Sequence, residues 1–236
     1  MSWLDSLRRA VSGGGPADPE LRRRYDAWRK RPDPDLDADH LMTRYVVVDV
    51  EASGLDAERD RLISIGAVAV DRGLIDARDS FEVVLRQDQV STDENILIHG
   101  IGGSAQREGA EPAEAMLAFL DFIGKSPLVA YHTFFDEAMI GRAAQETLGV
   151  RPDLVWIDLA WVLPDLFPDG HHQVTGLDQW LQVFGIPNFQ RHNAVSDCYA
   201  TAQLLQIAFG RARKCDVATP ARLKQLEKSR RWLRPS

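Results

Sequence analysis

The chain has 236 residues, of which 44% are hydrophobic and 27% charged, which is the balance of a globular domain of ordinary size. No apolar run approaches the roughly 20 residues that a bilayer span requires, and the first residues lack the apolar segment of a signal peptide. Only Cys198 and Cys215 are present, so the sequence predicts neither a disulfide framework nor a cysteine zinc site. We therefore expect a cytoplasmic protein that does not bind membranes.

The net charge of -7 is unevenly distributed along the chain. Residues 21–31 hold six basic side chains and one acid, and residues 211–236 hold nine and two, so the centre is strongly acidic. Basic ends could attract phosphate to metal-dependent chemistry on a phosphodiester. They could equally be two solvated helices on an acidic protein, and charge alone does not decide between these interpretations.

Breaker residues divide the chain into three parts. Residues 1–40 form a basic N-terminal extension with a short helix over 19–30, residues 41–212 form the main domain, and residues 213–236 form a basic C-terminal tail. Arginines of the N-terminal helix could contact nucleic acid or line a solvated face, and the tail could bind nucleic acid, another subunit or nothing.

Hydrophobic periodicity predicts an α/β domain with a five-stranded mixed sheet flanked by helices. Three consecutive strands are expected to be antiparallel, with a hairpin signal at residues 71–73 (DRG) after the second of them, and two later strands alternate with helices. The expected strands cover residues 45–50, 62–70, 80–85, 127–131 and 154–157, and the main helices cover 111–124, a segment that starts near 136, 177–184 and 194–209.

Two carboxylates follow the first predicted strand, at Asp49 and Glu51. Alternate residues of a strand share a face, so these side chains should point the same way with Cα atoms about 6.6 Å apart. Like charges at the end of a buried strand repel each other unless a proton or a cation intervenes. A divalent metal would remove the conflict, although a strand end that simply reaches solvent would show the same pattern.

Two further acids are expected near the same point. Asp136 follows the fourth strand, and Asp197 lies in the first turn of a late helix with His192 in the preceding loop. Four oxygen donors suit Mg²⁺ or Mn²⁺, and an imidazole beside them could accept a proton. Singly, each acid could be a helix N-terminal residue favoured by the dipole, and the histidine an ordinary loop residue.

The chain resembles the DEDDh family of 3'-5' exonucleases, which includes the proofreading subunit of bacterial DNA polymerase III, RNase T and oligoribonuclease. Residues 49–55 (DVEASGL) are similar to the first family motif, and Phe135-Asp136 to the second. The third motif, His-x-Ala-x-x-Asp, is matched in full by residues 192–197 (HNAVSD), and residues 99–101 (HGI) resemble a substrate-side element.

The resemblance implies an RNase H-like fold, with residues 41–212 as the exonuclease domain. It implies two divalent cations, Mg²⁺ or Mn²⁺, and a general base that activates the attacking water. The implied metal ligands are Asp49, Glu51, Asp136 and Asp197, and the implied base is His192.

The resemblance also implies contacts with the 3' end of the substrate. Leu55 would wedge against the terminal base, the backbone at Ala52 and Gly54 would meet the 3' end, and His99 and Phe135 would lie near the terminal nucleotide. Single-stranded DNA is the expected substrate, and a polymerase subunit or a repair protein is a candidate partner.

Two departures from the family pattern bear on substrate choice. Tyr131-His132 replaces the usual His-Asn pair, and Ala52 replaces a threonine. His132 could contact substrate or be a buried strand-end histidine. Asp158, after the fifth strand, is expected to cap a helix.

Three functions remain open from the sequence. The first is a metal-dependent exonuclease that releases nucleoside 5'-monophosphates from the 3' end of DNA. The second is the same chemistry on RNA or short oligoribonucleotides, because the contacts that read a 2'-hydroxyl cannot be placed from sequence. The third is a binding or adaptor module with a decayed site, which the intact set of five catalytic residues argues against.

Overall fold

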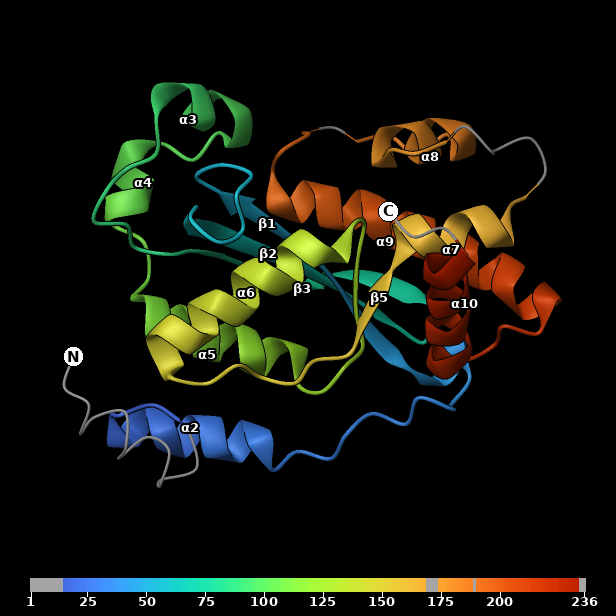
Figure 1. Cartoon of the computed structure of the whole chain (residues 1–236), viewed down its shortest axis with the longest axis horizontal. Coiled ribbons are helices and arrows are strands. Elements are labelled where there is room, and N and C mark those ends of the chain that lie inside the picture. Colours follow the sequence, from blue (N-terminus) through green and yellow to red (C-terminus); the bar gives the residue numbers. More distant parts are fainter. Residues whose placement is uncertain (1–14, 169–173, 189, 234–236) are drawn as a thin grey trace.

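A single mixed sheet with helices on both faces forms the centre of the computed structural model, which describes residues 15–168, 174–188 and 190–233 (Figure 1). The strand order is β3-β2-β1-β4-β5, in which β2 pairs antiparallel with both β1 and β3, β4 pairs parallel with β1, and β5 pairs parallel with β4. The predicted five-stranded mixed sheet is therefore confirmed. The strands are β1 (Arg44–Ala52), β2 (Leu62–Asp71), β3 (Leu74–Val84), β4 (Leu128–Ala130) and β5 (Trp156–Asp158).

Strand β1 lies at the middle of the sheet because it is apolar on both faces. Val46, Val48 and Val50 pack into one core cluster, whereas Tyr45 and Val47 pack into the cluster on the opposite face. This alternation agrees with the expectation that alternate residues of the first strand share a face.

Helices from distant parts of the chain cover the two faces (Figure 1). The first cluster includes residues of α2, α5 and α6, and the second includes residues of α7, α8, α9 and α10. Across the described ranges, no helix has both the length and the apolar character needed to cross a membrane. The helices are α2 (Pro19–Arg29), α3 (Asp93–His99), α4 (Gly103–Arg107), α5 (Pro112–Ile123), α6 (Thr133–Leu148), α7 (Leu159–Leu166), α8 (Leu177–Phe184), α9 (Ala194–Ala212) and α10 (Pro220–Leu233), with short 3-10 helices η1 (His40–Met42) and η2 (Arg213–Cys215).

The sequence predicted no helix at α3, α4 or α7, and it predicted β3 and α10 incompletely or not at all. Strand β3 begins at Leu74, six residues earlier than expected, because it is the sheet edge and its first side chains are mostly solvated rather than alternately apolar. Helix α10 occupies most of the segment expected to be a tail. Its only fully buried large apolar side chain is Leu223, so the sequence of α10 has no apolar stripe from which a helix could be predicted.

Candidate active site

Close approach between α9 and the sheet brings the distant acids together. Gly66 on β2 is the residue paired with Asp49 on β1. A Cβ atom on Gly66 would lie 2.5 Å from the backbone carbonyl carbon of Ala194, the first residue of α9. Because glycine has no Cβ, the first turn of α9 rests directly on the sheet and places Asp197 beside Asp49.

Three carboxylates gather at this point. Asp49, Glu51 and Asp197 each offer an oxygen atom that lies within 4.8 Å of the others. Glu51 is 9% exposed and Asp197 is 3% exposed, so water screens their charges poorly. Burial, together with the charge of Asp197, raises the pKa of Glu51 to about 8.

Asp136 lies in the first turn of α6 and is also buried. It is outside the group of three described above, yet after burial its charge is the largest cause that raises the pKa of Asp49 well above its usual value. Burial raises the pKa of Asp136 itself to about 8. Four mutually repelling oxygen donors of this kind are consistent with metal binding, since a divalent cation would stabilise their charged forms.

The loop before α9 contributes His192 and two further side chains that hold Asp197. His192 has a left-handed backbone (φ 59°), its N–H donates to Asp197 Oδ2 at 3.0 Å, and its side chain is exposed. Arg191 Nη1 donates to the same oxygen at 2.6 Å, and Asn188 Nδ2 donates to Asp197 Oδ1. Sequence reasoning missed Arg191, although a basic residue directly before the motif histidine was a readable signal.

Arg191 also connects the acidic cluster to α8. Its Nε atom lies 2.7 Å from Asp178 Oδ1, in the first turn of that helix. The guanidinium group therefore has one carboxylate at the cluster and one at the rim, and its charge lowers the pKa of Glu51 against the effect of burial.

A cleft of about 900 Å³ opens above the acids. Of the five residues predicted to be catalytic, Asp49, Glu51, His192 and Asp197 line the cleft, whereas the buried Asp136 is not part of its lining. Leu55 is 92% exposed at the cleft edge. Other exposed apolar side chains at the edge come from α3. The residues that line the cleft besides Asp49, Glu51, Asp197 and His192 include Ala52, Gly54, Leu55, Asn95, Leu97, Ile98, Tyr131, His132, Phe135, Leu177 and Arg191.

His99, expected near the terminal nucleotide, lies behind the wall of the cleft. The side chain is 4% exposed and is not part of the cleft lining. Its Nε2 atom lies 2.9 Å from Asn95 Oδ1, and its Nδ1 accepts from the N–H of Ile101 at 2.9 Å. Asn95 in turn donates to the carbonyl of Ala52 at 3.1 Å, so His99 supports the cleft wall from behind.

His132 lies on the cleft side of the β4–α6 turn and is exposed, so it is not a buried strand-end histidine. Asp158 caps α7 as expected, because its carboxylate accepts from the N–H of Ala160 at 3.0 Å. The same carboxylate also accepts from the N–H of His132 at 2.9 Å, a contact that the sequence did not predict.

Comparison with known families supports the same chemistry. Residues 46–205 match the family model described as "Exonuclease" (RNase_T). The DNA polymerase III PolC-type protein of Bacillus subtilis (strain 168) is 30% identical over 165 residues, which cover 68% of this chain and 11% of that protein. The corresponding protein of Thermotoga petrophila is 26% identical over 160 residues, with the same coverage. The chain thus spans about a tenth of the length of these relatives.

Solved structures with the same fold include nucleases bound to DNA. E. coli Exonuclease I in complex with a dT13 oligonucleotide has a TM-score of 0.63 at 18% identity, covering 73% of this chain and 42% of that one. Exonuclease X in complex with 5' overhanging duplex DNA has a TM-score of 0.59 at 19% identity, covering 78% and 99%. At these identities the likeness establishes a shared fold.

Proposed function

The chain belongs to the DEDDh family of 3'-5' exonucleases, and on that premise we propose that it removes nucleoside 5'-monophosphates from the 3' end of DNA. The observation that supports this most directly is the meeting of Asp49, Glu51 and Asp197 within 4.8 Å at the floor of a cleft. The cleft also presents an exposed histidine, His192, beside these acids.

Each group in the cleft has a role in this proposal. Asp49, Glu51, Asp136 and Asp197 would hold two divalent cations, Mg²⁺ or Mn²⁺, and these cations would supply charge stabilisation for phosphoryl transfer. His192 accepts the proton of the attacking water, which its exposure permits. Arg191 keeps Asp197 in place through the 2.6 Å contact between their side chains.

The cleft edge suits an unpaired 3' end. Leu55 and Leu97 are 92% and 85% exposed, and apolar side chains in such positions can act as wedges against bases and unstack them. Ala52, Gly54 and Phe135 line the cleft wall and would position the terminal nucleotide, with His99 acting only through Asn95. Exonuclease I bound to oligothymidylate shares the fold, so single-stranded DNA is our first substrate; a polymerase or repair partner is a separate expectation that the proposal does not require.

A matched digestion tests the proposal. DNA and RNA single strands of one sequence, each labelled at the 3' end or the 5' end, are incubated with Mg²⁺, Mn²⁺ or chelator. We expect metal-dependent release of 3'-terminal mononucleotides from DNA. His192→Ala should lower the rate by at least about a hundredfold, the usual contribution of a general base, and Asp197→Asn at least as far.

The control is Asp76→Asn, which removes an acid from the exposed edge strand β3 and should leave the rate unchanged. Faster digestion of RNA would overturn the DNA assignment. Activity that survives in both Asp197→Asn and Asp136→Asn would belong to a contaminant and would favour the adaptor interpretation.

A further inference from the structure

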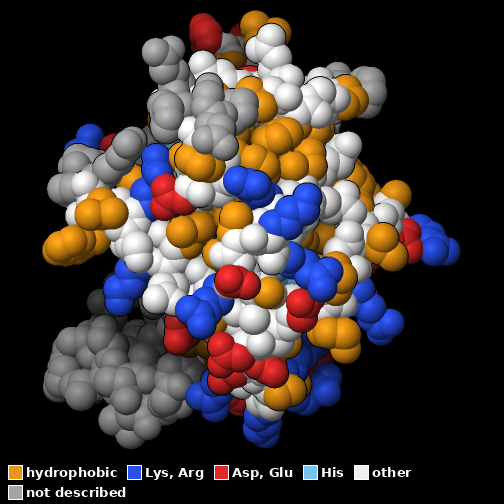
Figure 2. All heavy atoms as spheres, turned by 90° about the vertical axis from the view of Figure 1, so that its right-hand side faces the viewer, with side chains coloured by type: hydrophobic (Ala, Val, Ile, Leu, Met, Phe, Trp, Pro, Cys, Tyr) orange, Lys and Arg blue, Asp and Glu red, His pale blue; other side chains and the backbone are white. Residues whose placement is uncertain are grey.

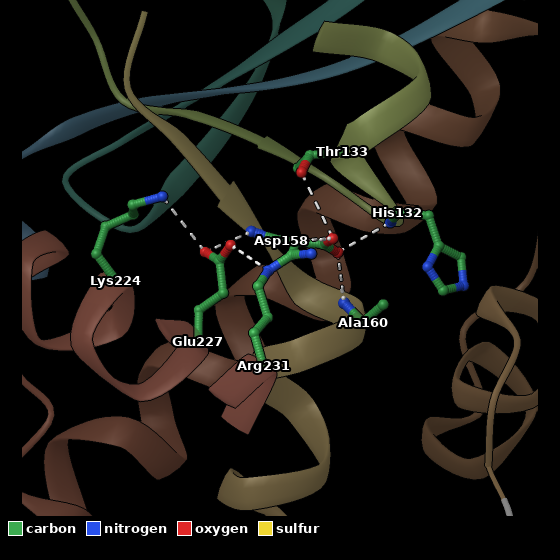
Figure 3. Close-up of polar contacts among 7 residues, drawn as sticks. All are labelled: His132, Thr133, Asp158, Ala160, Lys224, Glu227 and Arg231. Atoms are coloured by element: carbon green, nitrogen blue, oxygen red, sulfur yellow. Dashed lines mark hydrogen bonds and ion pairs between the residues drawn. The ribbon is translucent and has the colours of Figure 1, made fainter. Parts of the chain in front are cut away.

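The C-terminal helix α10 contacts a buried acid that also holds a turn of the cleft. Asp158 ends β5, and its side chain is 2% exposed. Its Oδ2 atom accepts from Arg231 Nη2 of α10 at 2.7 Å, and its Oδ1 accepts from the backbone N–H of His132 at 2.9 Å (Figure 3). One carboxylate therefore joins α10 to the β4–α6 turn.

Arg231 is fixed on the α10 side by several contacts. Its Nε donates to Glu227 Oε1 at 3.0 Å, and its guanidinium lies 4.9 Å from the ring centre of Trp161. Glu227 is 6% exposed and accepts from the backbone N–H of Asp158 at 3.2 Å (Figure 3). Arg231 thus lies between two buried carboxylates, and without it their charges would repel each other in a poorly solvated place.

At the other end of this connection, His132 has an uncommon backbone conformation. Its φ of 66° and ψ of 60° are left-handed, a region that is unfavourable for a residue other than glycine. The hydrogen bond from its N–H to Asp158 stabilises this conformation. With the backbone held in this way, the imidazole points away from Asp158 (Figure 3) and lines the cleft.

The turn also sets the start of α6. Thr133 Oγ1 donates to Asp158 Oδ2 at 3.4 Å, and Asp136 follows one turn later in the same helix. Tyr131 packs edge-on against His132 with ring centres 4.8 Å apart and donates to the carbonyl of Thr175 at 2.9 Å. Both side chains that replace the family's usual His-Asn pair are therefore oriented by contacts at this turn.

We propose that Arg231 is a positioning residue: through Asp158 it holds the β4–α6 turn so that His132 faces the terminal nucleotide, and α10 thereby sets how tightly the cleft binds a 3' end. The inference rests on the proposed nuclease function and assigns part of its substrate binding to a helix outside the matched family region. Arg231 does not act as a phosphate contact, because its guanidinium group is engaged by Asp158, Glu227 and Trp161.

Steady-state kinetics on 3'-labelled single-stranded DNA test the proposal. Arg231→Ala should raise KM about tenfold, which corresponds to the loss of one oriented contact, while kcat stays within about twofold. Arg231→Lys should recover part of the loss, since an ammonium group can pair with Asp158 but cannot also bridge to Glu227 in the same fork. A fall in kcat with KM unchanged would overturn the proposal.

The control is Arg230→Ala, which removes the same charge from the neighbouring position of α10. Arg230 pairs with Asp165 on α7 and makes no contact with Asp158 among the described residues. This variant should keep the KM of the wild type. An equal rise in KM in both variants would indicate a general effect of positive charge on α10 and would contradict the specific connection.

A double-mutant cycle separates positioning from a merely structural role. If Arg231 acts through His132, then Arg231→Ala should raise KM in the wild type but not in a His132→Ala background. Additive increases in KM would show that the two residues act independently. If Arg231→Ala unfolds at the assay temperature, the cycle is run with Arg231→Lys, and a lack of non-additivity there would also overturn the proposal.

A spectroscopic measurement distinguishes failure of this inference from failure of the proposed function. The ring Cε1–Hε1 NMR signal of His132, assigned by its loss in His132→Ala, should shift in Arg231→Ala and stay in place in Arg230→Ala. An unshifted signal in Arg231→Ala would overturn the connection. If the wild type digests neither DNA nor RNA, the proposed function fails, whereas the NMR result still decides whether α10 orients His132.

Discussion

Two basic helices lie outside the matched exonuclease region, and they are used differently. On α2, Arg24 pairs with Glu114 and Asp121 of α5, whose side chains are 50% and 43% exposed. On α10, Arg231 pairs with Asp158, whose side chain is 2% exposed. Both helices are basic, but of the two only α10 pairs with an acid, Asp158, that holds a residue of the cleft lining, His132.

The contrast shows that net charge is a poor guide to the role of a basic segment. Figure 2 shows the side of the molecule where α10 lies. The Lys and Arg side chains on this side are interspersed with acidic and apolar side chains. Arg230, Arg231 and Lys224 all have acidic partners. The burial of the partner, rather than the number of positive charges, separates a structural helix from one that influences the site.

The largest expected effect is the pH dependence of stability, which should come from the acidic cluster and not from the basic helices α2 and α10. Burial and mutual repulsion raise the pKa of Glu51 and of Asp136 to about 8, whereas unfolded carboxyls titrate near about 4. The folded, metal-free protein therefore keeps protons that the unfolded chain releases. Its stability should fall as pH rises from about 4 to about 8 and level off above that range.

Thermal unfolding in chelator between pH 5 and 8.5 measures this loss. The fall in Tm with rising pH should be smaller in Glu51→Gln than in the wild type in chelator. It should be smaller still in the wild type when Mg²⁺ replaces the chelator. Arg24→Ala and Arg231→Ala should keep the wild-type slope, because neither arginine is among the causes that shift these two pKa values. A slope that is equal in the wild type and Glu51→Gln would contradict the assignment of a raised pKa.

The next effect tests whether α2 is held by apolar contacts rather than by charge. Trp28 is 2% exposed, donates to the carbonyl of Gly124 at 2.6 Å and lies under Lys125. Trp28→Ala should lower the free energy of unfolding by about 3–5 kcal/mol, as is usual for a buried aromatic residue. Trp232→Ala, which alters a tryptophan that is 82% exposed on α10, should change it by less than about 0.5 kcal/mol.

The Trp28→Ala variant also tests whether α2, unlike α10, has no influence on the cleft. Because α2 contributes no residue to the cleft lining, folded Trp28→Ala should keep the kcat and KM of the wild type. A clear rise in KM would mean that both helices influence substrate binding.

The smallest effect compares the ion pairs themselves. Arg231→Ala leaves Asp158 and Glu227 without their shared partner and should cost about 2 kcal/mol, the scale for an unsatisfied buried group. Arg24→Ala removes two pairs between partly exposed side chains, with Glu114 and Asp121, and should cost less than about 1 kcal/mol. Urea unfolding at low and high salt measures both, and salt should reduce the Arg24 effect more. Equal losses would remove the distinction between the helices.

The sequence predicted what short-range periodicity can reveal. The run around Val46, Val47 and Val48 identified the central strand, and the alternation within it predicted that Asp49 and Glu51 share a face. The four acids and His192 could be predicted to share a site because each lies near a recognisable strand end or helix start. Helix α9 was similarly visible from its apolar stripe and from the motif at its first turn.

Contacts between residues far apart in the chain could not be predicted in this way. The pair of Arg231 with Asp158 spans 73 positions, and α10 buries too little apolar surface to show a stripe. His99 matched a family element, yet whether its ring faces the cleft or Asn95 depends on the orientation of α3, which no local pattern specifies. Arg191 was overlooked because its two carboxylate partners come from different helices.

Gly66 has a consequence for which changes the protein can accept. The strand and the helix touch there without any side chain between them, since even a methyl group would meet the backbone of Ala194. An alanine at this position would act as a spacer, and the gap it opened would fall between Asp49 and Asp197, not in the apolar interior. The close contact between Gly66 and Ala194 thus also determines the separation of Asp49 and Asp197.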